Sequence, residues 1–400
     1  MHFAALFVVL FLGTLHVQNA ECVVIDNTRP KLDLDGRIVN AHDGTIRKYG
    51  DYYYYHGAEY GLCAEPPKYG CDQTADRCGF HSNHNVSIYK SKDLGNDSWE
   101  RVGTAVQCTE LEDCGILYRP HLVFNPLTKK YVLFVNYVGK DRISYNGNAV
   151  FSSDFPEGPF TLETKKMNLT RLCPGPFASE PCGEAQGGCG DFDVLVDPAD
   201  GQAYIAYGCQ FYMSIEKLTA DFYNVAPIPS SGNGNATAGG KFGGSVFPDY
   251  FVEAPSFFER AGTYYLLYGH CCCFCEQGSG VLVYTAKHPM GPWIPQPGGD
   301  LACVSPSHET PAMFKGIPTP NQGCLYNGAK EISVTNAQQN FVIKVDREHG
   351  NATYVWTGDL WQQAPDGLKG HEGQFWYPLK FDSQGRIAPL KHIDSFTLDE

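Results

Sequence analysis

"EAPSFFERAGTYYLLYGH", residues 253–270, places one carboxylate, Glu253, ahead of two aromatic-rich runs that meet at Ala261-Gly262. Aromatic and β-branched runs on both sides of a glycine-containing turn predict a β-hairpin. Four further hairpin patterns occur along the chain, at residues 46–57, 122–135, 193–208 and 341–356. Their spacing of roughly 60 to 80 residues divides the chain into five similar units.

Further strand-like segments follow several of these hairpins, at residues 87–99, 149–160 and 281–293. A repeated sheet of four strands is the signature of a propeller blade. No long stretch shows sustained helical periodicity. We therefore predict an all-β fold, a single five-bladed β-propeller over residues 28–395, with disulfide-pinned loop insertions such as the Cys-bracketed segment 63–78.

The composition disfavours several classes of partner. The chain has 400 residues, of which 18% are charged, and a formal net charge of −14. Nucleic-acid binding needs basic stripes, which an acidic chain does not favour. Beyond the N-terminal region no segment is long and apolar enough to span a membrane. We expect a monomer that binds neither nucleic acid nor membranes.

The N-terminal region predicts export. Residues 5–15 form an apolar run of signal-peptide length, and the small residue Ala20 gives a cleavage point, so residues 1–20 are predicted to be a signal peptide. The alternative is a buried N-terminal strand. Sixteen cysteines, all beyond this run, imply disulfides and a secreted, extracellular protein. Five glycosylation sequons fit that location: Asn85, Asn96, Asn168, Asn235 and Asn351.

Three acids precede hairpins by similar distances, namely Asp43, Asp191 and Glu253. The corresponding place in the second unit, residues 118–121, has no acid. The first strand of each blade lines the central channel, so acids at matched repeat positions would meet at one mouth. Hydrolysis of a glycosidic bond uses one protonated acid and one carboxylate, and a third carboxylate can raise the pKa of the acid. The alternative is that these acids cap turns.

Aromatic rings could stack on a sugar near these acids. The candidates are Tyr60, Tyr118, Trp293 and Trp376. The alternative for each is packing within a sheet or the core. The segment "HCCCFC" at residues 270–275 has a spacing that fits a zinc site, but an oxidising compartment favours disulfides.

The order of these motifs resembles glycoside hydrolase family 43, a family of five-bladed propellers that are secreted inverting hydrolases. The resemblance rests on "AHDG" (41–44), "DFDVLVDPADGQAYIAYG" (191–208), "EAPSFFERAGTYYLLYG" (253–269) and "HPMGPW" (288–293). Within the family the chain is most similar to the exo-β-1,3-galactanase-like branch, through segments such as "YRPHLVFNPLTKKYVLFV" at residues 118–135.

The resemblance implies roles for the three acids: Asp43 as general base, Asp191 as pKa modulator and Glu253 as general acid. The galactanase branch has Gly in place of Asp43 and uses a Gln that aligns with Gln338, so either residue could handle the water. That branch also has Glu where this chain has Tyr118. The predicted substrate-binding residues are His42, Tyr118, Arg119, Gln338 and Trp376.

The resemblance implies no required cofactor, although the channel could hold a cation such as calcium, through His371 or His270. The predicted function is an inverting glycoside hydrolase of plant or algal polysaccharide. The linkage is left open between β-1,3-galactan or arabinogalactan and arabinofuranosyl or xylosyl bonds. The alternative function is a catalytically silent, carbohydrate-binding propeller.

Overall fold

The computed structural model describes most of the chain as strands and their connections. The described residues are 22–64, 78, 84–111, 114–139, 146–169, 190–208, 212–227, 246–248, 252–270, 276, 278–298, 300–302, 313–314, 317–318, 334–347 and 352–398. Within them the helical elements are two short 3₁₀ turns, η1 (Cys108–Glu110) and η4 (Lys369–His371). The predicted signal peptide, the "CCCFC" run and the sequons at Asn235 and Asn351 lie outside the described residues.

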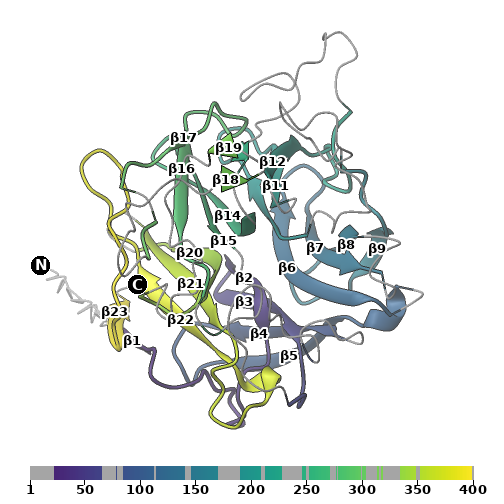
Figure 1. Cartoon of the computed structure of the whole chain (residues 1–400). Helices are drawn as coiled ribbons and strands as arrows, with labels where there is room; N and C mark the ends of the chain where they lie inside the picture. The colour runs from purple at the N-terminus through teal and green to yellow at the C-terminus, as the bar shows by residue number, and fades with distance from the viewer. Residues whose placement is uncertain are drawn as a thin grey trace, which may run out of the picture.

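Five antiparallel sheets are arranged around a common centre (Figure 1). Blade 1 contains β2 (His42–Tyr49), β3 (Tyr52–Glu59), β4 (Asn85–Ser91) and β5 (Glu100–Val106). Blade 2 contains β6 (Ile116–Asn125), β7 (Lys130–Val138), β8 (Asn146–Ser153) and β9 (Thr161–Thr164). Blade 3 contains β10 (Phe192–Val196), β11 (Ala203–Gly208), β12 (Tyr212–Lys217) and β13 (Val246–Pro248).

Blade 4 contains β14 (Val252–Arg260), β15 (Thr263–His270), β16 (Leu282–Ala286) and β17 (Ile294–Pro295). Blade 5 has three described strands, β20 (Gln338–Val345), β21 (Thr353–Leu360) and β22 (Gly373–Pro378). A separate small hairpin joins β18 (Met313–Phe314) and β19 (Ile317–Pro318). The predicted five-bladed, all-β propeller is confirmed.

The innermost strands close a ring, because each contacts the next in chain order and β20 contacts β2. Outside the ring, β1 (Val23–Asp26) pairs with β23 (Ser395–Leu398) and brings the two ends of the described chain together (Figure 1). The side chain of Asn27 accepts a hydrogen bond from the backbone of Trp376 and donates one to its carbonyl. The N-terminal segment is thereby fixed to blade 5.

Neighbouring blades are held together by separate apolar layers. One layer, between blades 5 and 1, contains Tyr55, Trp99, Phe341 and Trp376. Equivalent layers lie between each other pair of neighbours. Burial of large aromatic side chains is worth a few kcal/mol each, of order 1.5–3 for a fully buried one. The aromatic richness of the sequence is therefore used mainly to join the blades.

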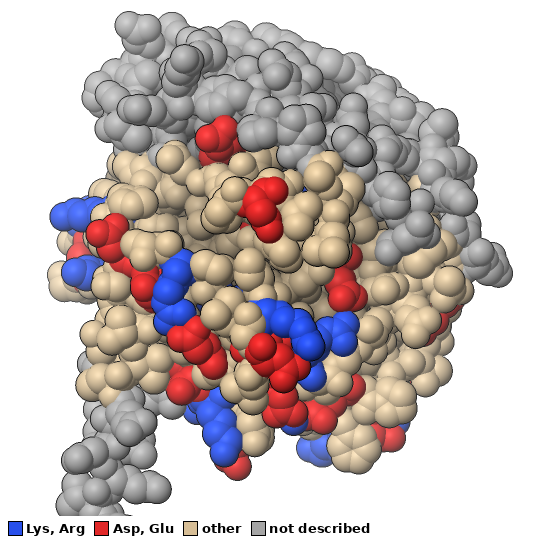
Figure 2. Space-filling view, turned by 90° about the horizontal axis from the view of Figure 1, so that it is seen from below, with Lys and Arg blue, Asp and Glu red and all other residues tan. Residues whose placement is uncertain are grey.

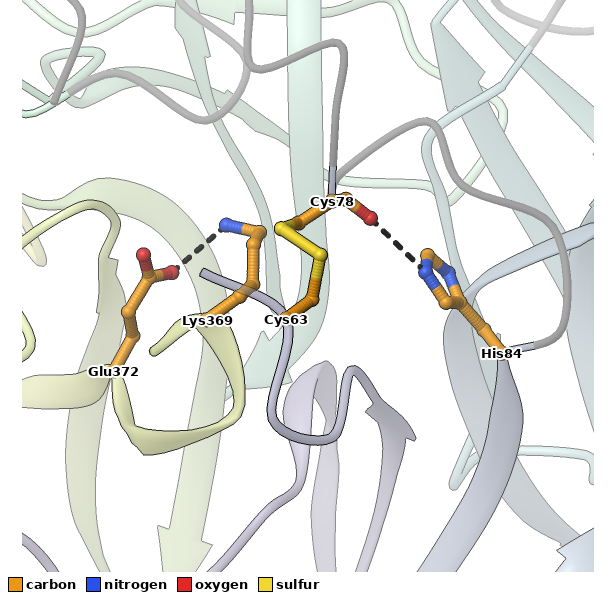
Figure 3. Close-up of a disulfide and its surroundings, with 5 residues drawn as sticks. All are labelled: Cys63, Cys78, His84, Lys369 and Glu372. Carbon is orange, nitrogen blue, oxygen red and sulfur yellow. Dashed lines mark hydrogen bonds and ion pairs between the residues drawn. A yellow bond between two sulfur atoms is a disulfide. The ribbon is translucent and has the colours of Figure 1, made fainter. Parts of the chain in front are cut away.

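Two disulfides are present among the described residues, Cys63–Cys78 and Cys108–Cys114. The first joins the two ends of the Cys-bracketed insertion in blade 1 (Figure 3), which confirms the predicted disulfide-pinned loop. The second spans η1, between blades 1 and 2.

The surface seen in Figure 2 carries Lys and Arg beside Asp and Glu, with both signs interspersed. Exposed ion pairs among the described residues include that of Arg29 with Asp97. Among the residues that the structure describes, no helix is long and apolar enough to cross a membrane.

Asn96 and Asn168 are two predicted sequon asparagines in different surroundings. Asn96 is only 2% exposed, and its side chain both accepts from the backbone N–H of Asp26 and donates to the Asp26 carbonyl. Asn168 is exposed. We expect Asn96→Ala to lower the free energy of unfolding by about 1–3 kcal/mol, because it leaves part-buried backbone groups of Asp26 without their side-chain partner. Asn168→Ala should change it little. Urea denaturation of both variants checks this, and equal stabilities would contradict it.

Candidate active site

One end of the channel is lined by the first residues of the innermost strands. Glu253 stands seven residues before Arg260, the last paired residue of its strand. Counting back seven residues from the last paired residue of β2, β6 and β20 leads in each case to a predicted substrate-binding residue. The four residues at this level are His42, Tyr118, Glu253 and Gln338. The structure thus brings them to one mouth.

Asp43 and Asp191 do not share this level, so the predicted matched repeat positions are wrong in detail. Asp43 stands six residues before Tyr49, and Asp191 stands five before Val196. Asp43 lies in a β-bulge, one of three that follow His42, Tyr118 and Glu253, whereas Asp191 lies just before β10, which pairs with β11 without a register shift. Bulges redirect side chains and are frequent next to active sites.

The bulges have a residue in the left-handed conformation at the same place in three blades. The φ angles are 49° at Asp43, 46° at Arg119 and 52° at Ala254. None of these residues is glycine, so the conformation costs about 1–3 kcal/mol at each and must be held by its surroundings. The bulges turn Asp43 and Arg119 toward each other.

Arg119 connects the acids. Its backbone N–H donates to Asp43 Oδ1 at 3.3 Å, and its Nε lies 2.8 Å from Asp191 Oδ1. Its Nη1 also donates to Asn340 Oδ1 in blade 5 at 3.1 Å. The second oxygen of Asp191 accepts the backbone N–H of Ala254 at 2.8 Å. The guanidinium and backbone N–H of Arg119, together with the carboxylate of Asp191, therefore connect the starts of the inner strands from all five blades.

Asp43 lies in a buried environment with a second carboxyl nearby. Its Oδ2 accepts the hydroxyl of Tyr60 at 3.3 Å, and its backbone N–H donates to Asp359 Oδ1 at 3.4 Å. Burial raises the pKa of Asp43 to about 8, although the charge of Arg119 opposes the rise. Burial also raises the pKa of Asp359 to about 6. At neutral pH the Asp43 carboxyl of the free protein is therefore mostly protonated.

Glu253 is bonded to Gln338, its neighbour at the same level in blade 5. Gln338 Nε2 donates to Glu253 Oε2 at 3.0 Å. Gln338 Oε1 in turn accepts the indole N–H of Trp361 at 2.5 Å. Glu253 thus has a carboxyl whose position is fixed by a neighbouring amide. Trp361, which follows β21 directly, and Asp359, within β21, were both missed by sequence reasoning, because neither precedes a hairpin.

An apolar wall stands beside Asp43. It is made by the buried side chains of Ala58, Tyr60, Ile116, Tyr118, Val138 and Trp361. Two of the aromatic sugar-stacking candidates, Tyr60 and Tyr118, belong to this wall. His42 packs against Tyr60 and Trp361, with ring centroids 5.4 and 5.9 Å away. Burial, with the charge of Lys369, lowers the pKa of His42 to about 3, so this imidazole is neutral.

Two aromatic candidates lie away from this mouth. Trp376 is 0% exposed in the layer between blades 5 and 1, with Lys31 Nζ 3.8 Å from its ring centre. Trp293 is buried against Phe257 between blades 3 and 4. The predicted substrate-binding role of Trp376 is therefore wrong. The ring packs in the core, and neither of its faces is open to a sugar.

Within the described residues no group of three or more His, Cys, Asp or Glu side chains is arranged to hold a metal ion. His371 pairs with Asp366 at 2.6 Å, and the side chain of His270 is outside the described part. Inside the channel, Asp193 accepts His121 Nδ1 at 2.9 Å. A channel cation such as calcium stays a prediction.

The far end of the channel holds a cavity of about 350 Å³. Its lining comes from all five inner strands and includes Arg47, Val123, Leu195, Phe257 and Phe341. These residues follow the acids along their strands, so the cavity lies at the hairpin end, away from Glu253.

A family model described as glycosyl hydrolases family 43 matches residues 38–316. The chain belongs to this family. The matched range includes Asp43, Arg119 and Asp191, which are joined at the channel mouth, and Glu253, whose neighbour Ala254 donates to Asp191. Membership confirms the predicted family and the prediction that the chain is a glycosidase.

Solved structures of the same family share the fold. An exo-β-1,3-galactanase from Clostridium thermocellum is 22% identical, with a TM-score of 0.65, over 94% of this chain and 67% of that one. An exo-β-1,3-galactanase from Phanerochaete chrysosporium, solved with β-1,3-galactotriose, is 19% identical, with a TM-score of 0.62, over 93% and 68%.

A third similar structure is a family 43 β-1,3-galactosidase with galactodeoxynojirimycin, 20% identical, with a TM-score of 0.61, over 92% of this chain and 99% of that one. The chain therefore spans about two thirds of the two galactanases and nearly all of the galactosidase. No sequence among curated proteins matches it.

Proposed function

We propose that the protein hydrolyses terminal β-1,3-galactosyl bonds of galactan or arabinogalactan with inversion at the anomeric carbon. The observation that carries the proposal is the joining of Asp43, Asp191 and Glu253 at one channel mouth, through Arg119 and Ala254, in a family 43 chain. The choice of galactan is supported by the similar structures, which are named as β-1,3-galactanases and galactosidases.

In this proposal Glu253 is the general acid that protonates the leaving oxygen. A carboxyl suits this role when its position is fixed, and the bond from Gln338 fixes it. Asp191, paired with Arg119, places a negative charge in the same network without being the proton donor. Inversion requires a water on the far side of the sugar from the acid, and Asp43 is the proposed base for that water.

The pH dependence tests the role of Asp43. A base must be ionised, so with a pKa of about 8 the value of kcat/KM should rise with pH up to about 8. Asp43→Asn should remove this limb and lower kcat/KM by on the order of 10²-fold. The measurement is a pH–rate profile of both proteins. The contrary result is an active Asp43→Asn variant together with pH–rate profiles of both proteins that lack this rise. It would indicate that Gln338, whose amide does not titrate, handles the water instead of Asp43.

The substrate is tested by incubating purified protein with β-1,3-galactan, arabinogalactan and aryl β-galactoside, arabinofuranoside and xyloside. We expect free galactose from the galactans and the galactoside. Release of arabinose or xylose without galactose would support a hydrolase but contradict the proposed specificity for galactosyl bonds. Binding of galactan with no sugar released from any substrate would instead support a carbohydrate-binding propeller.

We further propose that the protein is exported and glycosylated, which the N-terminal apolar run, the cysteine count and the sequons other than the buried Asn96 support. An extracellular location suits a polysaccharide substrate, because polymers of this kind lie outside cells.

A further inference from the structure

The amide of Gln338 lies between Trp361 and Glu253, and its orientation decides what it offers the acid. An indole N–H can only donate a hydrogen bond. The atom of Gln338 that faces Trp361 must therefore be the carbonyl oxygen, Oε1, which lies 2.5 Å from the indole nitrogen. The opposite end, the NH₂ group, then faces Glu253 Oε2 at 3.0 Å.

This orientation has a consequence for the proton of Glu253. An amide N–H cannot accept a hydrogen bond, so the carboxyl oxygen that faces it, Oε2, must be the acceptor. When Glu253 is protonated, the proton is then held on Oε1. If the amide were turned over, its carbonyl could accept the proton from Glu253 and hold it against blade 5.

Trp361 is itself fixed by the loop segment beside blade 1. It is buried, and Lys369 Nζ lies 3.9 Å from the centre of its ring. Lys369 is buried too and pairs with Glu372 at 2.8 Å, and its backbone N–H donates to the carbonyl of Cys63. Figure 3 shows this ion pair beside the Cys63–Cys78 disulfide. A cation is attracted to the face of an indole, and this attraction helps to hold the ring of Trp361 in place.

We propose that Trp361 is a positioning residue for the acid: it sets the Gln338 amide so that the proton of Glu253 is kept on the oxygen that Gln338 does not face. The inference rests on the proposed role of Glu253 as general acid, but it makes a separate claim about the amide.

The neighbouring pair Trp356 and Gln339 gives a matched control. The indole of Trp356 donates to Gln339 Oε1, also from blade 5, and Trp356 is equally buried. The NH₂ group of Gln339 donates to the carbonyl of Asn340 and not to Glu253. Trp→Phe at either place removes one indole bond to a glutamine, but only one of the two glutamines contacts the acid.

The kinetic test compares Trp361→Phe with Trp356→Phe on β-1,3-galactobiose and on a dinitrophenyl β-galactoside. On galactobiose, whose leaving group needs a proton, Trp361→Phe should lower kcat by on the order of tenfold, with KM little changed. On the dinitrophenyl substrate its loss should be much smaller. Trp356→Phe should affect both substrates alike. A Trp361→Phe variant that also slows both substrates alike would overturn the proposal.

An NMR test reads the amide without activity. The side-chain amide protons of Gln338 are identified by their loss in Gln338→Leu. Glu253→Gln should move these resonances in the wild-type background and not in the Trp361→Phe background, as a double-mutant cycle requires for coupled residues. Equal shifts in both backgrounds would overturn the inference, whereas an inactive wild-type protein that shows the expected shifts would overturn only the proposed function.

Discussion

Glu253→Gln is expected to lower kcat on β-1,3-galactobiose by on the order of 10²–10⁴. Glutamine keeps the shape of the side chain but has no acidic proton for the leaving oxygen. The dinitrophenolate of a dinitrophenyl β-galactoside leaves without being protonated. The hydrolysis of this substrate should therefore be slowed far less. The measurement is steady-state kinetics on both substrates.

Glu259→Gln is the matched control, because Glu259 lies on the same strand at the hairpin end, where its carboxylate accepts the backbone N–H of Gly262. It should retain activity on both substrates. A Glu253→Gln variant that hydrolyses galactobiose at the wild-type rate would remove Glu253 from the acid role.

Arg119→Met is expected to have the second large effect, on activity and on stability together. Methionine retains much of the side-chain length but leaves Asp191, whose side chain is only 21% exposed, without its 2.8 Å partner. Breaking a buried pair in this way costs about 3–5 kcal/mol of unfolding free energy. We also expect kcat/KM to fall by on the order of 10²-fold, because misplacing catalytic groups by about 1 Å costs that much.

Denaturation and kinetics on the same preparation measure both effects. Arg47→Met is the control, since Arg47 is also on an inner strand but its contact with Asp193 is longer, at 3.4 Å. It should cost less stability and little activity. Arg119→Lys should restore little, because an ammonium cannot reproduce the planar set of donors that reaches Asp191 and Asn340. Near wild-type kcat/KM in Arg119→Met would contradict the role assigned to it.

The fold could be predicted because its signals are local. Each blade begins with a hairpin whose turn residues and aromatic flanks stand together in the sequence, as in residues 253–270. The ring that closes β20 on β2 then follows from repetition. The unit with three described strands, blade 5, gave the same hairpin signal as the others.

The candidate site could be predicted only to within one or two residues along each strand. Asp43, Arg119 and Ala254 adopt a left-handed conformation, although none of them is glycine, the residue that usually indicates it. The sequence therefore gave no signal for the bulges that set the side-chain directions. Arg119 was predicted only as a substrate-binding residue, and its motif, which has no acid, gave no sign that it connects Asp43 with Asp191. Whether an aromatic ring lies at the mouth or in the core depends on which face of the strand it occupies, which misplaced Trp376.

Residues beyond the first strand of each blade were missed for a different reason. Asp359 on β21 and Trp361 just after it reach the mouth because β21 pairs with β20, where Gln338 stands opposite Asp359. That pairing is visible only once the register is known.

The central claim is that this channel mouth hydrolyses a β-galactosyl bond with inversion. Proton NMR of β-1,3-galactotriose during the first minutes of reaction tests it most directly, because the anomeric signals distinguish the two products before they equilibrate. The account predicts that α-galactose appears first. β-Galactose as the first product would contradict it, and so would intact galactotriose after prolonged incubation with folded protein.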